Sequence, residues 1–215
     1  MKVIEDKQSI RTKYLIDLSK YEITEKINHG AYGHVVKIKN KKTEEEYAAK
    51  IIYDTTTEYD KKMINREIGI LIRLQHPTLI RFIGYSLKDF LGQDNVVIVT
   101  EYARNGSLYD VLKENRKGNT NEMYDNTTRQ KILIGISYAM MYLHRNHVIY
   151  RDLKPANVVL DEYYHPHLTD FGTSKFSRPG HTLEQTRQHG SLLYMAPEVL
   201  ADKDYDGKAD VYSFA

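Results

Sequence analysis

The chain has 215 residues, 41% of them hydrophobic, so it is long enough to bury the core of one large domain or of two small lobes. Lysine and arginine number 31 against 29 aspartates and glutamates, a balance that indicates neither a nucleic acid nor an anionic membrane as partner. Cysteine is absent, which excludes disulfides and thiolate metal sites and favours a reducing compartment such as the cytoplasm.

No segment predicts export or a membrane span. Residues 1–20 are interrupted by charges and lack the continuous apolar run of a secretory signal, so we interpret them as an N-terminal extension. The longest nearly apolar stretch, Ile132 to Leu143, is too short to cross a bilayer and predicts a buried helix.

The first part of the chain predicts a small β-rich lobe. Short β-like runs alternate with turns, one of them a charged turn at residues 40–44, and one helix is expected between Tyr59 and Leu74. The expected strands are Tyr21 to Asn28, Gly33 to Lys39, Glu46 to Tyr53, Leu79 to Leu87 and Val96 to Tyr102.

The pattern becomes helical after residues 103–107. Ser107 is placed to cap a helix through Val111 and Leu112, and the polar residues 113–127 predict an exposed connector. A second helix is expected from Thr128 to Arg145. Its apolar stripe consists of Ile132, Ile136, Ala139, Met140 and Leu143.

Gly30 and Gly33 lie in a predicted hairpin, within the segment Ile-Asn-His-Gly-Ala-Tyr-Gly-His-Val at residues 27–35. Glycines let backbone N–H groups approach a phosphate because no side chain blocks the way. Two glycines in a hairpin are equally typical of an ordinary turn, so this segment needs support from the rest of the chain.

Lys50 lies inside an otherwise apolar predicted strand, and Glu67 lies on the apolar stripe of a predicted helix. A carboxylate in such a place is costly to bury without a cation, and we expect Lys50 to be its partner. The alternative is a surface lysine on the helix of Glu67 itself.

Residues 149–160 read Ile-Tyr-Arg-Asp-Leu-Lys-Pro-Ala-Asn-Val-Val-Leu, and residues 169–172 read Thr-Asp-Phe-Gly. Asp152, Lys154, Asn157 and Asp170 therefore follow one another in the order needed for phosphoryl transfer: a carboxylate for a hydroxyl proton, a cation for the moving phosphoryl group, and two oxygen ligands for Mg²⁺. With these motifs the chain resembles the eukaryotic protein kinases, over about Tyr21 to Phe214.

The resemblance implies an α+β, protein-kinase-like two-lobe fold. Residues 1–20 would be an N-terminal extension, residues 21–103 the β-rich N-lobe, and residues 104–215 a mainly helical, partial C-lobe. The final segment, residues 209–215, is similar to the opening of the central C-lobe helix, so we expect an incomplete C-lobe with exposed apolar side chains.

The resemblance also implies the cofactors ATP and Mg²⁺ and a role for each matching residue. Asp152 would accept the hydroxyl proton, Lys154 would steady the γ-phosphoryl group, Asn157 and Asp170 would bind Mg²⁺, and Lys50, paired with Glu67, would orient the phosphates. Glu101 and Ala103 would bind adenine through their backbones, with Thr100 as gatekeeper. The full set of expected nucleotide contacts is Ile27, Gly30, Gly33, Val35, Ala48, Lys50, Thr100, Glu101, Ala103 and Val159.

Lys154, in Asp-Leu-Lys-Pro-Ala-Asn, resembles serine/threonine kinases, whereas residues 76–84 and 99–108 resemble tyrosine kinases. The mixture predicts the tyrosine-kinase-like group of serine/threonine kinases. Two residues depart from the usual pattern: Asn28 stands at the first glycine position, and Tyr150 stands at a position that is histidine in most kinases. We expect Tyr150 to pack on Phe171, in a spine completed by Leu71 and Phe82.

Residues 173–189 form a basic, hydroxyl-bearing loop with Ser174, Ser177, Thr182 and Thr186. A phosphate added there, which we expect at Thr182 or Thr186, would pair with Arg151 and order the loop. Incidental hydroxyls in a mobile loop are the alternative. The nine histidines form no zinc motif, and residues 165–167 predict a turn before a strand.

Two functions therefore compete. The first is a kinase that transfers the γ-phosphoryl group of ATP to Ser/Thr hydroxyls of a protein substrate. The second is a catalytically weak or inactive nucleotide-binding module or scaffold, which the incomplete C-lobe would favour. The oligomeric state is not indicated by the sequence.

Overall fold

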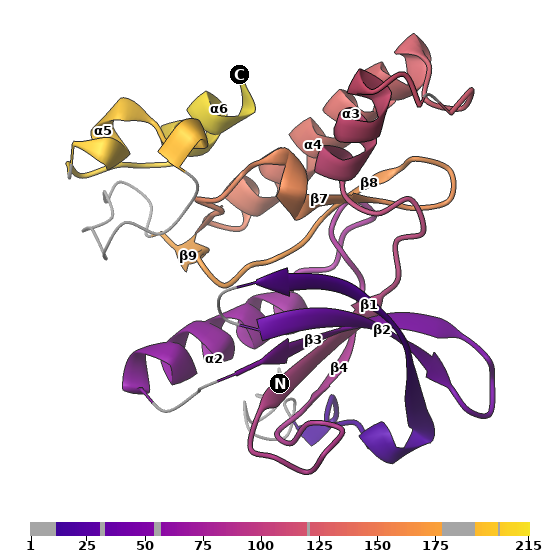
Figure 1. Ribbon diagram of the computed structural model, residues 1–215. Coiled ribbons are helices and arrows are strands. Elements are labelled where there is room, and N and C mark those ends of the chain that lie inside the picture. Colours follow the sequence, from indigo (N-terminus) through magenta and orange to yellow (C-terminus); the bar gives the residue numbers. More distant parts are fainter. Residues whose placement is uncertain (1–11, 31–32, 54–56, 120, 178–191, 202) are drawn as a thin grey trace, which may run out of the picture. The chain divides into compact units, whose positions relative to one another are not determined.

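The computed structural model describes residues 12–30, 33–53, 57–119, 121–177, 192–201 and 203–215 (Figure 1). The chain divides into two compact units, one formed by Met1–Ile68 and Arg81–Tyr102 and the other by Gly69–Ile80 and Ala103–Ala215. The first unit contains a β-sheet and the second is mainly helical, so the predicted α+β fold is confirmed.

The first unit is built on a five-stranded antiparallel sheet with the strand order β1-β2-β3-β5-β4. A short 3-10 helix, η1 (Leu18–Lys20), precedes the first strand. The strands are β1 (Tyr21–Gly30), β2 (Gly33–Asn40), β3 (Glu46–Ile52), β4 (Phe82–Ser86) and β5 (Val96–Glu101).

The strand expected over Leu79 to Leu87 is shorter than predicted. It begins only at Phe82, because Leu79 and Ile80 belong to the second unit, where they pair with Leu168. The charged turn between β2 and β3 is confirmed. The Asn40 side-chain oxygen accepts the N–H groups of Lys42 and Thr43 at 2.9 and 3.2 Å, which satisfies the turn locally.

Strand register places the core of this unit on one face of the sheet. Val36 lies opposite Ala49, and Ala49 lies opposite Val99, so these side chains point the same way. They are buried together with Ile38, Ile51, Val97 and Leu18. The core therefore draws its residues from three neighbouring strands and from η1.

Helix α2 (Glu58–Arg73) confirms the helix expected between Tyr59 and Leu74. The Thr57 hydroxyl accepts the N–H of Asp60 at 3.1 Å and so caps the first turn. Ile64, Ile68 and Leu71 are buried, in agreement with the apolar stripe in the sequence.

The second unit contains the helices α3 (Leu108–Arg116) and α4 (Asn126–Arg145) (Figure 1). Two small antiparallel pairs accompany them, β6 (Val148–Ile149) with β9 (Lys175–Phe176) and β7 (Val158–Leu160) with β8 (Pro166–Leu168). The remaining elements are η2 (Pro155–Asn157), η3 (Leu192–Tyr194), α5 (Pro197–Leu200) and α6 (Lys208–Phe214).

Ser107 caps α3 as predicted, with its hydroxyl accepting the N–H of Asp110 at 3.2 Å. The exposed connector expected over residues 113–127 is wrong in two respects. Residues 113–116 continue α3, and Tyr124 is buried with its ring 5.8 Å from that of Tyr164. The polar composition of this segment concealed one buried aromatic side chain, which packs where the chain turns back into α4.

The apolar stripe of α4 is buried in full, as predicted. Among the described residues, no helix combines the length and apolar character needed to cross a membrane. The expected exposure of apolar side chains on α6 is also observed, at Val211, Tyr212 and Phe214.

Helix α4 and strand β8 approach so closely that only glycine fits between them. A Cβ atom added at Gly135 would lie 2.4 Å from Cγ of Pro166, well inside van der Waals contact. The glycine weakens the helix by about 1 kcal/mol relative to alanine, so its presence reflects this contact rather than helix propensity.

We expect Gly135→Ala to destabilise the chain by about 1 to 2 kcal/mol, because overpacking outweighs the gain in helix propensity. Urea unfolding measures the change. Ser137→Ala, on the exposed side of the same helix, is the control and should be nearly neutral. A Gly135→Ala variant more stable than the wild type would contradict the tight contact with Pro166.

Candidate functional site

Four of the predicted nucleotide contacts share one face of the sheet in the first unit. Val35 lies opposite Lys50, and Ala48 lies opposite Thr100. Because alternate residues of a strand point the same way, Val35, Ala48, Lys50 and Thr100 all point away from the core face described above. The strand register therefore presents a lysine and three small or branched side chains on one surface.

The glycine-containing hairpin is described at its base, while Ala31 and Tyr32 lie outside the described residues. Gly30 and Gly33 are opposite each other, and Ile27 lies at an irregularity of the β1–β2 ladder, before Asn28 pairs with Val35. Gly33 has φ 152°, and a Cβ atom there would lie 2.0 Å from the carbonyl oxygen of Ile51. The sheet itself therefore requires glycine at position 33.

The predicted ion pair between β3 and α2 is present. The Nζ atom of Lys50 lies 2.9 and 3.1 Å from the two carboxylate oxygens of Glu67. The Glu67 side chain is only 6% exposed, whereas that of Lys50 is 33% exposed. The lysine therefore neutralises a buried carboxylate while part of its own side chain still faces solvent.

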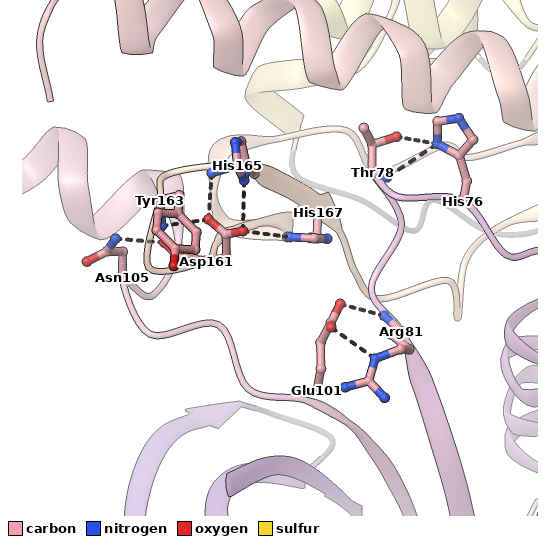
Figure 2. Close-up of polar contacts among 9 residues, drawn as sticks. All are labelled: His76, Thr78, Arg81, Glu101, Asn105, Asp161, Tyr163, His165 and His167. Atoms are coloured by element: carbon pink, nitrogen blue, oxygen red, sulfur yellow. Dashed lines mark hydrogen bonds and ion pairs between the residues drawn. The ribbon is translucent and has the colours of Figure 1, made fainter. Parts of the chain in front are cut away.

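Glu101 ends strand β5, and both its side chain and its backbone contact Arg81. Its carboxylate accepts the backbone N–H of Arg81 at 2.8 Å and lies 3.3 Å from Nε of the same residue (Figure 2). The backbone N–H of Glu101 in turn donates to the Arg81 carbonyl at 3.0 Å. The sequence suggested only a backbone role for Glu101, and the observed contacts fix the end of β5 against the start of β4.

In the second unit, Asp152, Lys154 and Asn157 form one cluster. The Asp152 carboxylate lies 2.7 Å from Nζ of Lys154 and accepts the side-chain N–H of Asn157 at 2.8 Å. The same amide group donates to the Asp152 carbonyl at 2.8 Å. Pro155 begins η2 and brings Asn157 back toward Asp152, so three of the predicted site residues are held together by short contacts.

A buried carboxylate that the sequence did not single out supports this loop. Asp210, 1% exposed, accepts the backbone N–H of Tyr150 at 2.9 Å and of Arg151 at 2.7 Å. The His144 ring approaches the same carboxylate at 2.8 Å. Arg151 has φ 76°, a costly conformation for a bulky residue, and the contact with Asp210 holds it there. The only signal in the sequence was a charge inside an apolar helical segment.

The segment that carries Asp170 lies beside the same loop. The Thr169 N–H donates to the Asn157 carbonyl at 3.0 Å, and the Tyr150 hydroxyl donates to the Thr169 carbonyl. The Tyr150 and Phe171 rings meet edge to face at 5.5 Å, so the expected packing of these two side chains is confirmed. The spine as a whole stays a prediction, because Phe82 belongs to the first unit.

Asn157 and Asp170 fit the chemistry of a magnesium site. The Asn157 amide nitrogen is directed to Asp152, so its oxygen is the atom left to ligate, and Asp170 adds a carboxylate. Mg²⁺ prefers such hard oxygen ligands and completes its shell with phosphates and water. Within the described ranges, no group of three or more histidine, cysteine, aspartate or glutamate side chains is placed to hold a metal on its own.

The predicted phosphorylation loop is described only up to Ser177, so Thr182 and Thr186 lie outside the described residues. Ser174 is fully buried, and its hydroxyl donates to the Tyr150 carbonyl at 3.2 Å, so this hydroxyl is not exposed to receive a phosphate. Ser177 lies against the His147 carbonyl, to which its N–H donates at 2.7 Å. The first residues of this loop are therefore hydrogen-bonded to His147 and Tyr150.

The turn between β7 and β8 is closed by Asp161 (Figure 2). Its carboxylate accepts the N–H groups of Tyr163 and His165 at 2.9 and 2.8 Å and lies 3.0 Å from the His165 ring. The Asn105 side chain donates to the Asp161 carbonyl at 2.7 Å, which ties the segment after β5 to β7, the strand that carries Val159. The turn predicted at residues 165–167 lies earlier in the chain, because Pro166 and His167 already belong to strand β8. His165 joins a network around Asp161 that the sequence did not reveal.

We expect Lys50→Met to destabilise the chain by about 2 to 3 kcal/mol, because Glu67 loses its cation; partial exposure of the lysine keeps the value at the low end. Adding Glu67→Leu should restore part of the loss. Urea unfolding measures the free energies of the four variants in this cycle. Lys61→Met, in an exposed pair with Glu58, is the control and should change stability little. Purely additive effects at 50 and 67 would contradict the coupling.

The Asp161 carboxyl predicts that the stability of the fold depends on pH in the acid range. Burial raises the pKa of its carboxyl, but the N–H groups of His165 and Tyr163 and the His165 ring outweigh burial and hold the pKa below its ordinary value. A carboxyl with a lowered folded pKa stabilises the fold above its unfolded pKa of about 3.9, and this contribution is lost as the pH falls through the folded value.

Asp161→Asn should therefore cost about 1 kcal/mol at pH 7 and should lose less further stability than the wild type on acidification below about pH 4. Unfolding followed at pH 7, 5 and 3 measures both effects. Asp94→Asn is the control, since the Asp94 side chain is 91% exposed. Parallel stability curves for Asp161→Asn and wild type would show that the Asp161 carboxylate does not matter.

Comparisons with known proteins agree on one relationship. The family model described as protein kinase domain matches residues 21–215. Serine/threonine-protein kinase STY46 of Arabidopsis thaliana is 34% identical over 93% of this chain and 32% of its own length, and STY17 of the same plant is 31% identical over 93% and 33%. Human serine/threonine-protein kinase TNNI3K is 34% identical over 93% of the chain and 23% of its own length.

The chain spans a third or less of the length of these relatives. The matched region contains the cluster around Asp152, the Lys50–Glu67 pair and the segment of Asp170. On this evidence the chain belongs to the protein kinase domain family.

Proposed function

We propose that the chain is a serine/threonine protein kinase domain that transfers the γ-phosphoryl group of ATP to a hydroxyl of a protein substrate. The observation that carries the proposal is the cluster in which Lys154 and Asn157 hold the Asp152 carboxylate, with the segment of Asp170 hydrogen-bonded to Asn157. The names of the three relatives reported above, each a serine/threonine-protein kinase, support the class of acceptor.

The proposed nucleotide contacts begin with one face of the sheet in the first unit. Val35, Ala48 and Thr100 share a sheet face with Lys50, which supports their role as adenine and phosphate contacts. The remaining proposed contacts are Ile27, Gly30, Gly33, Glu101, Ala103 and Val159. We assign residues 21–103 to the N-lobe and residues 104–215 to the C-lobe. The division of the chain after Tyr102 supports this boundary, whereas Gly69–Ile80 group with the second unit.

In the proposed reaction, the substrate hydroxyl oxygen forms a bond to the γ-phosphorus while the bond between that phosphorus and the β–γ bridging oxygen breaks, and ADP leaves. The hydroxyl proton passes to the Asp152 carboxylate, which is 9% exposed and therefore held in a largely water-free place. Lys154 keeps its charge beside the transferred group. Asn157 and Asp170 hold Mg²⁺, which when bound neutralises phosphate charge.

Lys50 is proposed to orient the phosphates. Its ammonium group is fixed by Glu67 and still partly exposed, which suits a cation that must meet an anionic ligand. A cytoplasmic location and a role in signalling are further proposals, supported by the cysteine-free composition and by the family respectively.

The test is phosphate transfer to a generic basic protein by the purified chain with Mg·ATP. Asp152→Asn should reduce the rate by about 10² to 10⁴, the usual contribution of a general base, and should keep nucleotide binding. Thermal stabilisation by Mg·ATP checks binding, since a ligand at 100 times its Kd adds about 2.7 kcal/mol. Asp94→Asn, at an exposed site, is the control and should retain the wild-type rate.

Phosphoamino-acid analysis of the product identifies the acceptor, which we expect to be serine or threonine. Equal rates in wild type and Asp152→Asn would remove Asp152 from the mechanism. Stabilisation by Mg·ATP without any transfer would favour the second candidate, a nucleotide-binding module without catalysis.

A further inference from the structure

A segment outside the matched kinase region is built into the first unit. The family match begins at residue 21, yet residues 14–18 contribute to the core of the sheet. Leu18 is buried in that core, and Ile16 packs against it. We call Tyr14–Leu18 the N-terminal strap.

The strap extends the sheet beyond its edge strand. The Ile16 N–H donates to the Tyr85 carbonyl at 2.9 Å, and the Tyr85 N–H donates to the Tyr14 carbonyl at 2.9 Å. Leu15 forms a parallel bridge with Tyr85. Strand β4 is last in the order β1-β2-β3-β5-β4, so the strap satisfies backbone groups of Tyr85 that the sheet leaves at its edge.

Strand β4 is shaped to receive the strap. A Cβ atom at Gly84 would lie 2.5 Å from Cγ2 of Ile16 and 2.6 Å from the Tyr14 carbonyl oxygen. Both atoms belong to the strap, so glycine at position 84 is required by docking of the strap. The absence of a side chain there forms a seat for an extended segment.

Further contacts anchor the segment that follows. The Asp17 carboxylate accepts the N–H of Ser19 at 3.0 Å and caps η1. Lys41 donates its backbone N–H to the Lys20 carbonyl at 2.9 Å and its side-chain ammonium to the Ser19 carbonyl at 2.8 Å. The residues directly after the strap are therefore joined to the β2–β3 turn.

One strap side chain packs on Phe82, the ladder partner of a proposed nucleotide contact. The Tyr14 ring lies 5.3 Å from the ring of Phe82, tilted by 41°. Phe82 is opposite Thr100 in the β4–β5 ladder, and Thr100 is opposite Ala48 in the next. A change at Tyr14 can therefore act on Thr100 through one intervening side chain.

We propose that the β4 edge is a strand-docking site, occupied in cis by the strap, and that docking supports the nucleotide site by holding Phe82 and Thr100 in place. The occupant is an extended segment with a β-branched apolar residue over Gly84 and a backbone N–H facing the Tyr85 carbonyl. This is recognition by strand addition, with affinity from backbone hydrogen bonds and specificity from the glycine seat. The coupling to nucleotide rests on the proposed function, whereas docking does not.

Two variants of the full chain should release the strap from β4, one by a change in β4 and the other by a change in the strap. Gly84→Ala fills the seat, and Ile16→Pro removes the N–H that binds Tyr85. In both we expect the Tyr85 amide hydrogen to exchange at least about tenfold faster, while the amide of Val99 in the central strand β5 keeps its protection. Leu15→Ala is the matched control, because the Leu15 side chain is exposed and the backbone bonds of the strap remain.

A synthetic peptide of residues 12–20 sharpens the test. Added in trans, it should restore protection of Tyr85 in Ile16→Pro, where the glycine seat is intact, and should fail in Gly84→Ala. The Kd for Mg·ATP, measured by calorimetry, should rise by about threefold to tenfold in both variants and should fall back in Ile16→Pro with the peptide.

Unchanged exchange at Tyr85 in Gly84→Ala, or rescue of that variant by the peptide, would overturn the docking site. Faster exchange with an unchanged Kd for Mg·ATP would overturn the coupling and leave the strap as a cover for the sheet edge. A wild-type chain that does not bind Mg·ATP would overturn the proposed function together with the coupling, and exchange would still decide docking.

Discussion

The loop that carries Asp152 depends on one buried carboxylate, Asp210. Asp210 is almost inaccessible to solvent, and the N–H groups of Tyr150 and Arg151 and the ring of His144 all meet it. Burial of such a group is costly without donors, and a buried N–H without an acceptor is costly too, so each satisfies the other. The hydrogen bond to Asp210 holds the strained backbone of Arg151, and Asp152 is the next residue in the chain. The position of the proposed base is therefore set by packing beneath the loop.

The same balance of burial and charge operates in the first unit. Glu67 is tolerated in a buried position because Lys50 reaches it, and Lys50 can reach it because the strand register turns alternate residues of β3 away from the apolar core. Burial of one face of the sheet in the core thus determines which residues of each strand point to the opposite face. In both units, a buried carboxylate positions a group proposed for chemistry: Glu67 positions Lys50, and Asp210 positions the loop of Asp152.

Local patterns in the sequence predicted much of this molecule. The β-like runs, the stripe of α4 and the cap at Ser107 are each contained in a few consecutive residues, and apart from the start of β4 they were confirmed. The Lys50–Glu67 pair was also predictable, because a charge on an apolar stripe demands a partner. The roles of Asp210 and the N-terminal strap were not predictable, since their contacts join segments about sixty to seventy residues apart and no local pattern indicates the partner. The prediction of an exposed connector over residues 113–127 was wrong for a different reason: the segment is polar overall, but it contains one buried aromatic side chain, Tyr124.

Glycine at position 33 carries a consequence for how variants of this chain are interpreted. A side chain there would collide with the carbonyl oxygen of Ile51, so β2 and β3 would have to separate before any ligand was considered. Loss of ATP turnover after replacement of this glycine would thus report a damaged scaffold as readily as a damaged phosphate cradle. The residue is a poor diagnostic of nucleotide contact, and side chains such as Val35 and Ala48, which the fold does not force to be small, are the more informative ones to change.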